Sequence, residues 1–405
     1  MGTDITSIPT FPMERVHPLH PAPEYEQARQ QAPFKRIRLW NGRQAWLATR
    51  YDDVLKVLQD PRFSQLPTHE NYPFPSESRA TLLRTERMPI NQMDPPDHTK
   101  IRRMFSRMFT VKNIEMLRPK VQQMVDSLLD EMLAGPKPAD FYNAFALPIP
   151  SWVIAELLGV PHTDHAFFQK IARARFLHGG DPQAPLVAGE QIRVYLDDLI
   201  KKKEADPGEG TDVISRLVIE QIRPGHLSHD DAVVHVRQLL LAGHDTTANT
   251  IALGALTLFE NPDQLEQLKA DPSLVRNAVE EMLRYLTIAQ FNSGRVALED
   301  IEVSGHLIKR GEGVVASLAA ANRDPSVFPD PDHFDILRDA SRQVAFAYGV
   351  HSCLGQPLAR LELQVVFTTL FKRVPTLRLA VPFGDVQFTG NSTQAYGVHE
   401  LLVTW

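Results

Sequence analysis

The most informative stretch of this sequence is Phe346-Ala347-Tyr348-Gly349-Val350-His351-Ser352-Cys353-Leu354-Gly355. It holds the only cysteine of the chain, so this thiol makes no disulfide within the chain. Gly349 and Gly355 flank the cysteine, and they allow the backbone to turn tightly and a large group to approach closely. The run 356–367 has apolar residues at helical spacing and a proline in its first turn. We therefore expect Cys353 to lie just before a helix N-terminus.

This position favours a thiolate at Cys353, because the helix dipole and the N–H groups of the first turn stabilise negative charge. A thiolate on a loop bracketed by glycine is a ligand for a soft metal centre or a nucleophile. A lone cysteine is otherwise most often a small buried hydrophobe. The cysteine and its helix leave all three interpretations open.

The composition excludes several classes of protein. The chain has 405 residues, of which 43% are hydrophobic, so it can bury a large core. Its net charge of -6 argues against a nucleic-acid partner. A single cysteine argues for the cytoplasm, and no run approaches 18 uninterrupted apolar residues, so no membrane span is predicted. Because no linker-like break interrupts the sequence, we expect one domain over 1–405.

A long helix is predicted from Ser228 to Phe259, opened by a capping box of Ser228 and Asp231. Its middle reads Ala242-Gly243-His244-Asp245-Thr246-Thr247, and the Thr246 hydroxyl can bond back to the Ala242 carbonyl and loosen the helix. A carboxylate beside a hydroxyl is unusual at the centre of a core helix. The alternative is a notch of small residues used only for packing.

Two other charged pairs stand at helical spacing. His98 and Arg102 are four residues apart and could clamp an anion, or they could form a solvated basic face. Glu281 and Arg284 are three residues apart, and most pairs of this kind are ordinary surface ion pairs.

The remaining pattern predicts a mainly α protein with a minor β region, an α+β fold. We expect a hairpin around Asn41-Gly42, a short helix ending at Asp60-Pro61, and a loop over 62–93 that forms part of a substrate mouth. One helix is expected over 111–133 and another that ends at Gly159. Two more are expected over 164–178 and 186–203. A hinge joins these two helices, which could act as a lid. Residues 287–295 read as strand-like, and short strands and a β tail are expected over 296–315 and 376–403.

The cysteine stretch, followed by Pro357-Leu358-Ala359-Arg360, resembles the haem-ligand signature of the cytochromes P450. It differs at Ala347, where the family more often has glycine. The segments Asp94-Pro95-Pro96-x-His98-x-x-x-Arg102, Gly243-x-Asp245-Thr246-Thr247 and Glu281-x-x-Arg284 are also similar to family patterns. The resemblance covers nearly the whole chain and is to bacterial P450s of the actinomycete type. It implies the P450 fold, with haem between the long central helix and the cysteine loop.

The resemblance also implies roles for particular residues. The cofactor would be haem b, iron protoporphyrin IX, with Cys353 as the iron ligand. Asp245 and Thr246 would be catalytic and handle protons. The haem contacts would be His98, Arg102, Arg295, Phe346, Gly349, His351 and Gly355. The substrate pocket would include Ala242, Ile288, Ala289, Gln290, Phe291 and Thr393. A structural network would join Glu281, Arg284 and Arg338.

The implied activity is that of a monooxygenase, which inserts one oxygen atom from O2 into an apolar small molecule by hydroxylation or epoxidation. The substrate would be of secondary-metabolite, steroid, terpenoid or xenobiotic type. The sequence has no flavin or nicotinamide fingerprint and no Fe–S cysteine set, so a separate ferredoxin or flavodoxin would supply electrons. The expected form is a cytoplasmic monomer.

A basic surface could receive that partner, although each of its charges could equally be ordinary solubilising charge. This set, the basic patch, is Arg103, Arg107, Lys112, Arg360, Lys372 and Arg373. Three alternatives to the monooxygenase remain: a peroxygenase, a nitric oxide reductase, or a haem-binding sensor without turnover. The intact Asp245-Thr246 pair disfavours the first two, whose members alter it.

Overall fold

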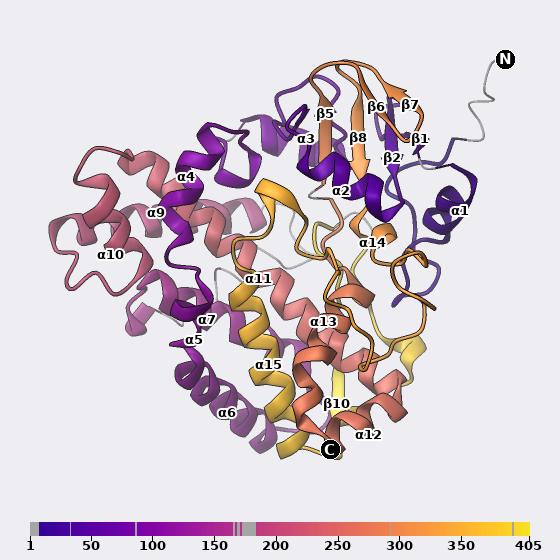
Figure 1. Cartoon of the computed structure of the whole chain (residues 1–405). Coiled ribbons are helices and arrows are strands. Elements are labelled where there is room, and N and C mark those ends of the chain that lie inside the picture. The colour runs from indigo at the N-terminus through magenta and orange to yellow at the C-terminus, as the bar shows by residue number, and fades with distance from the viewer. Residues whose placement is uncertain are drawn as a thin grey trace. The chain divides into compact units, whose positions relative to one another are not determined.

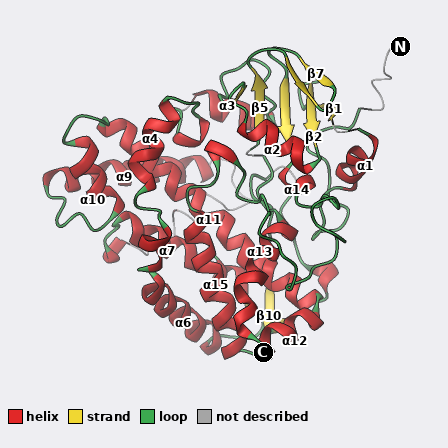
Figure 2. Ribbon diagram, viewed as in Figure 1, coloured by secondary structure: helices red, strands yellow, loops and turns green. Residues whose placement is uncertain are grey.

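A computed structural model describes residues 8–32, 34–85, 87–164, 167, 171, 184–291, 293–390 and 393–405. Helices dominate and the sheets are small, which confirms the predicted mainly α fold (Figure 2). The chain groups into two compact units. The first unit comprises Met1–Asp97, Leu253–Cys353 and Phe388–Gly397, and the second comprises His98–Ala252, Leu354–Gln387 and Val398–Trp405. A single domain over the whole chain stays a prediction.

The first unit is built around a five-stranded sheet in the order β1-β2-β8-β5-β3. Its strands are β1 (Phe34–Arg38), β2 (Gln44–Ala48), β3 (Phe63–Ser64), β5 (Gly294–Ala297) and β8 (Gly313–Ala316). The predicted hairpin is present, with β1 antiparallel to β2 and Gly42 at φ +79 in its turn. Strands from distant parts of the chain thus lie side by side, as the indigo and orange arrows in Figure 1 show. A separate hairpin pairs β6 (Ile301–Val303) with β7 (His306–Ile308).

The described part of the first unit also contains six whole helices. They are α1 (Pro23–Gln31), α2 (Tyr51–Gln59), α3 (Glu77–Thr85), α12 (Pro262–Ala270), α13 (Val275–Leu286) and α14 (Leu318–Ala321). Of these, α1 and α2 contact the sheet. The apolar side of α2, with Val54, Val57 and Leu58, lies in the same buried cluster as residues of β8. Helix α3 corrects the prediction of a loop over 62–93. It escaped prediction because only Ala80 and Leu83 of the helix join a buried cluster, too few for a helical period.

The second unit is almost entirely helical. Its helices are α4 (Asp97–Ser106), α5 (Val111–Glu115), α6 (Arg118–Ala134), α7 (Pro148–Leu158), α9 (Ala184–Ala205), α10 (Val213–Leu217) and α15 (Gln356–Arg373). Helix α7 ends at Gly159, as expected, with φ +81. Only glycine fits there, because a Cβ would come within 2.2 Å of the Asp212 carboxyl carbon. The predicted helix over 164–178 lies largely outside the described residues.

The long helix is α11 (His229–Glu260), whose 32 residues span about 48 Å. Its predicted capping box is confirmed: the Asp231 N–H donates to Ser228 Oγ at 3.1 Å, and that hydroxyl donates to Asp231 Oδ2 at 2.6 Å. The predicted β tail over 376–403 was largely wrong. Residues 376–403 contain β9 (Arg378–Leu379) and the start of β10 (Leu402–Thr404). Strand β10 pairs with β4 (Ala139–Asp140). The rest of this segment is mostly irregular, because proline and glycine interrupt it.

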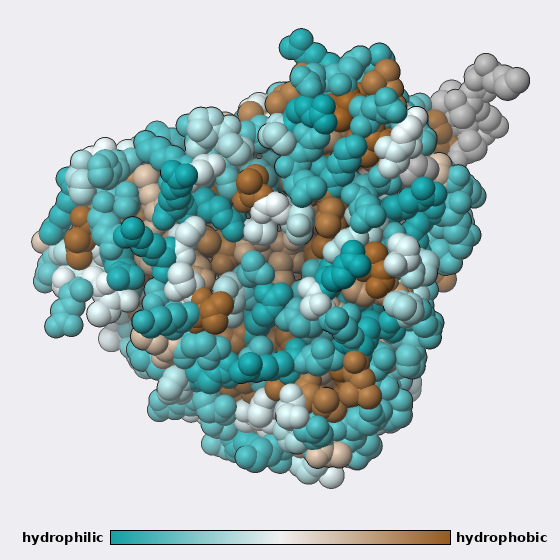
Figure 3. All heavy atoms as spheres, viewed as in Figure 1, coloured by the Kyte–Doolittle hydropathy of each residue, from teal (hydrophilic) through white to brown (hydrophobic). Residues whose placement is uncertain are grey.

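None of the described helices is long and apolar enough to cross a membrane. The face drawn in Figure 3 is mainly hydrophilic, and its apolar residues form separate groups. Scattered apolar side chains of this kind are normal on a folded protein.

Candidate active site

The cysteine loop is a tightly turned segment that packs on α2. Cys353 is exposed, and its N–H donates to the Phe346 carbonyl at 2.8 Å. The loop turns through Ala347 at φ 58 and Gly349 at φ 74. A Cβ on Gly349 would lie 3.1 Å from the Leu58 carbonyl oxygen of α2, so this glycine permits the close approach. Gly355 is the N-cap of α15, so the cysteine lies just before a helix N-terminus, as predicted.

Strand β5 of the same unit carries a buried cation. Arg295 is 1% exposed, and its Nη1 donates to the Gly294 carbonyl at 2.8 Å. Burial lowers the pKa of Arg295 to about 10, which leaves the guanidinium charged at neutral pH. No acidic side chain forms an ion pair with it among the described residues. A buried charge needs a counterion, so this site suits an anionic group of a ligand.

The predicted network of three charged side chains does come together. Glu281 and Arg284 of α13 are fully buried, and Arg284 donates from Nε to Oε2 at 2.7 Å and from Nη2 to Oε1 at 2.8 Å. Arg338 Nε donates to the same carboxylate at 3.3 Å. Arg284 Nη1 also reaches the Asn322 carbonyl at 2.8 Å, and the Asn322 side chain accepts the Val344 N–H at 2.8 Å. The network therefore extends to the start of the cysteine loop.

Two segments predicted to line the substrate pocket lie side by side in the first unit. Ala289 and Ala395 form an isolated antiparallel bridge. The Gln290 N–H donates to the Gln394 carbonyl at 3.1 Å, and the Gln290 side chain donates to the Thr393 carbonyl at 2.9 Å. The tail turn is thus attached to the segment that follows α13.

The other two residues of that segment differ in burial, because Ile288 is buried and Phe291 is half-buried. Ile288 is 7% exposed. Phe291 packs edge-to-face on Phe11, with ring centroids 5.8 Å apart, in the cluster formed by the N-terminal segment. A place for Phe291 in the substrate pocket stays a prediction. Thr287 takes a left-handed conformation that ends α13. The strand expected over 287–295 begins only at Gly294.

In the second unit, α4 presents the predicted cationic pair. His98 is 2% exposed and Arg102 is half-buried. Their spacing of one helical turn puts both on the same face of α4. Burial of His98 disfavours the solvated basic face that the sequence left open.

The centre of α11 has the predicted side-chain contact. Thr246 Oγ1 donates to the Ala242 carbonyl at 3.0 Å, although the helix continues without interruption. Ala242 is exposed and Thr246 half-buried, so this face of the helix is accessible. Asp245 is 9% exposed, and the Asn249 amide donates to its carbonyl and to its Oδ1 at 2.9 Å each. The spacing of four residues is the signal that could have identified Asn249 from the sequence.

A buried histidine beside this pair escaped prediction. The Ser151 hydroxyl of α7 donates to the Leu147 carbonyl at 3.0 Å, so it accepts the Nδ1–H of His244 at 2.7 Å. Burial lowers the pKa of His244 to about 3, so its ring is neutral at physiological pH. This bond fixes α11 against α7 one residue before Asp245. No sequence pattern indicates it, because the partners are 93 residues apart.

Comparisons with known proteins identify the family. A family model described as Cytochrome P450 matches residues 186–375. Cytochrome P450-SU2 of Streptomyces griseolus is 45% identical, over 96% of this chain and 94% of the relative. Vitamin D3 dihydroxylase of the same organism is 45% identical, over 99% and 98%. The crystal structure of cytochrome P450 MoxA from Nonomuraea recticatena matches with a TM-score of 0.93 and 44% identity, over 98% of each chain.

The chain therefore belongs to the cytochrome P450 family and is similar to its bacterial, actinomycete-type members. It is a monooxygenase, an oxidoreductase whose cofactor is haem b. The residues fit this group. The exposed Cys353 offers a soft ligand for iron, and the buried Arg295 guanidinium offers a counterion for a carboxylate of the porphyrin.

Proposed function

We propose that this protein inserts one oxygen atom from O2 into an apolar small molecule by hydroxylation or epoxidation, with Cys353 as the iron ligand. The observation that carries the proposal is the exposed cysteine on a loop that packs on α2 and is reached by the Glu281–Arg284–Asn322 network. Bound haem supplies the activation of O2, and a thiolate ligand favours cleavage of the O–O bond.

The haem carboxylates would be held by buried or half-buried cations. Arg295 is the strongest candidate, because its guanidinium is buried and charged. His98, Arg102 and His351 would bind the second haem carboxylate and the edge of the porphyrin that carries it. Phe346, Gly349 and Gly355 would pack close to the sulfur, where backbone N–H groups tune the electron density of a thiolate.

Proton delivery falls to the centre of α11. We assign Asp245 to carry protons inward, since Asn249 holds one oxygen of its carboxylate in place. The Thr246 hydroxyl would accept and pass on the proton at the accessible face. Ala242, Ile288, Ala289, Gln290, Phe291 and Thr393 would contact the substrate. A substrate of secondary-metabolite, steroid, terpenoid or xenobiotic type is supported by a relative named for hydroxylation of vitamin D3.

Electrons would come from a separate ferredoxin or flavodoxin that docks on the basic patch. Within the second unit α5 and α15 are neighbours, and Arg107, Lys112 and Lys372 are exposed. Arg373 contributes less than the sequence suggested, because it pairs with Asp126 at 3.0 Å and also with Asp130. We further propose a monomer located in the cytoplasm.

The first test is the carbon monoxide difference spectrum of the reduced protein, with Cys353→His and the neighbouring Ser352→Ala as its matched control. We expect a strongly red-shifted Soret band in the wild type and in Ser352→Ala, and its loss in Cys353→His. A band that survives in Cys353→His would refute the assigned ligand.

The second test separates a monooxygenase from a sensor, a peroxygenase or a nitric oxide reductase. Turnover with 18O2, NADPH, a ferredoxin reductase and a surrogate ferredoxin should place one labelled atom in the product of a screened substrate. Thr246→Ala should divert electrons to hydrogen peroxide while the Soret band remains. Unchanged product yield in Thr246→Ala would remove Thr246 from proton delivery, and turnover only with added peroxide would favour the peroxygenase. Electron consumption that depends on added nitric oxide would favour the reductase.

A further inference from the structure

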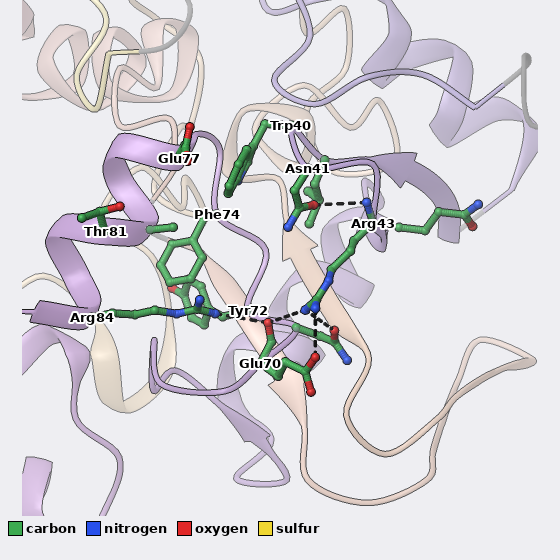
Figure 4. Close-up of a pocket in the computed structure, with 13 residues that line it drawn as sticks. Trp40, Asn41, Arg43, Glu70, Tyr72, Phe74, Glu77, Thr81 and Arg84 are labelled. Carbon is green, nitrogen blue, oxygen red and sulfur yellow. Dashed lines mark hydrogen bonds and ion pairs between the residues drawn. The ribbon is translucent and has the colours of Figure 1, made fainter.

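A buried polar junction in the first unit is separate from the hollow that Figure 4 shows. That hollow, of about 430 Å³, is lined from within 39–44 and 70–84, so it belongs with the loop expected to form part of a substrate mouth. The junction consists of Thr287, Asn322 and Val344, none of which lines the hollow. All three are at most 3% exposed, so hydrogen bonds among them are shielded from water.

Asn322 makes one side-chain hydrogen bond to each of two segments. Its Nδ2 donates to Thr287 Oγ1 at 2.8 Å, and its Oδ1 accepts the Val344 N–H at 2.8 Å. Thr287 ends α13 and directly precedes residues 288–291, which are assigned above to the substrate pocket and are called here the pocket segment. Val344 lies at the start of the cysteine loop. A single amide group therefore joins the pocket segment to the cysteine loop.

The orientation of this amide is fixed by its partners. A backbone N–H can only donate, so the atom that faces Val344 must be the amide oxygen. Thr287 Oγ1 donates its own hydrogen to the Arg284 carbonyl at 2.8 Å, so it accepts a hydrogen from Asn322. A flipped amide would lose both bonds. The junction therefore needs a side chain that donates on one side and accepts on the other, which leucine does not do.

Each bond holds a segment whose backbone is strained. Thr287 is a β-branched residue at φ 38, in the left-handed region that such residues rarely adopt. After Val344 the loop turns through Ala347, whose φ is 58 and whose N–H donates to the Val344 carbonyl at 2.9 Å. Strained backbone persists only where surrounding contacts hold it. Loss of the Asn322 amide would therefore let both segments relax.

We propose that Asn322 is a positioning residue, which fixes the pocket segment relative to the loop that carries Cys353. The inference rests on the proposed function, because it takes these two segments as the wall of the substrate pocket and the loop of the iron ligand. Asn322 acts on the first through Thr287 and on the second through Val344. Substitutions at this buried junction should therefore change how ligands fit the pocket.

The test compares two ligands that both coordinate ferric haem iron. Imidazole is small, whereas 4-phenylimidazole carries a phenyl ring that extends toward the substrate pocket. Each is titrated against the haem-loaded protein by its shift of the Soret band. The ratio of the two affinities reports the pocket wall, because effects on the iron alone cancel. A second readout is the rate at which the reduced carbon monoxide complex loses its red-shifted Soret band, which reports how firmly Cys353 is held.

Thr287→Val keeps the branched shape and removes the hydroxyl, whereas Thr287→Ser keeps the hydroxyl. We expect Thr287→Val to change the affinity ratio by about 5-fold or more, as expected for one hydrogen bond, and Thr287→Ser to keep it within about 2-fold of the wild type. Asn322→Leu should change the ratio as much and should also speed the loss of the red-shifted band by about 5-fold or more. In the double variant, Thr287→Val should add less than about 2-fold to Asn322→Leu, because their shared bond is lost only once.

The matched control is Asn277→Leu. The Asn277 side chain also donates two hydrogen bonds, to the Ile336 and Arg338 carbonyls at 2.5 and 2.8 Å, but both partners lie outside the two segments. This variant should leave both readouts unchanged, whatever stability it loses in urea unfolding. Changes in Asn277→Leu equal to those in Asn322→Leu would overturn the proposal, because they would show only the general role of a buried amide.

Two further results would also overturn it. One is an affinity ratio that neither Thr287→Val nor Asn322→Leu changes, and the other is additive effects in the double variant. If Asn322→Leu does not fold, the two Thr287 variants decide alone. A wild type without the red-shifted band would instead refute the proposed function.

Discussion

Acid should destabilise this protein through the buried His244. Burial lowers its pKa from 6.5 to about 3 in the folded protein. Between these two values the unfolded chain binds a proton that the folded protein does not. Stability is therefore lost as the pH falls through 6.5 toward 3. For these two pKa values the loss from pH 7.5 to pH 5 is about 2 kcal/mol.

The variant His244→Asn isolates this contribution. Asparagine does not titrate, and its amide can still donate to Ser151 Oγ as the imidazole does. The smaller side chain lowers stability at both pH values, but that cost is nearly independent of pH. The loss of unfolding free energy between pH 7.5 and 5 should therefore shrink by about 2 kcal/mol in the variant. His235, whose pKa burial lowers to about 4, acts equally in both proteins and cancels.

Urea denaturation followed by circular dichroism at the two pH values measures the effect, with unchanged slopes against urea as a check on the comparison. The control is His226→Asn, a change of an exposed histidine, which should leave the pH dependence as in the wild type. Equal acid sensitivity in the wild type and His244→Asn would contradict the argument, because it would mean that His244 does not remain neutral in the fold.

Three further substitutions test the fold around the site. Ala347→Gly should raise the free energy of unfolding in urea titrations by up to about 1 kcal/mol, because alanine at φ 58 is strained. A less stable variant would exclude that strain. Glu281→Gln should lower the free energy of unfolding by about 3–5 kcal/mol and reduce the haem content on purification, because it leaves buried guanidinium charge unpaired. Normal stability and haem content would disprove this. Gly159→Ala should lower the melting temperature more than Gly225→Ala, because Gly225 has a similar φ but open space where a Cβ would lie. Equal losses in the two variants would show that the contact with Asp212 has no effect on stability.

Much of the fold could be predicted because its signals are local. The Asn41-Gly42 turn, the Ser228 capping box and Gly159 each act within a few residues, and each is found where expected. Helix α3 was missed because only Ala80 and Leu83 of the helix join a buried cluster, which supplies little hydrophobic period. In the tail, chain reversals at glycine and proline replaced the alternating pattern of strands.

The candidate site divides in the same way. Short motifs located Cys353, Thr246 and the Glu281 network, because their spacing reflects the conformation of a single loop or helix. The partners that hold them are set by tertiary packing. The bond from Ser151 to His244 and the contact of Phe291 with Phe11 join residues far apart in the chain, so no local pattern could indicate them.

The division of the chain into two units has a consequence for biosynthesis. Each unit takes one of its three segments from the last 18 residues, Phe388–Gly397 in one and Val398–Trp405 in the other. Neither unit has all its parts until residues 388–405 have been synthesised. Contacts between segments so distant in sequence form slowly. The nascent chain must therefore keep apolar surface exposed until residues 388–405 emerge, and at that stage chaperones can shield this surface from aggregation.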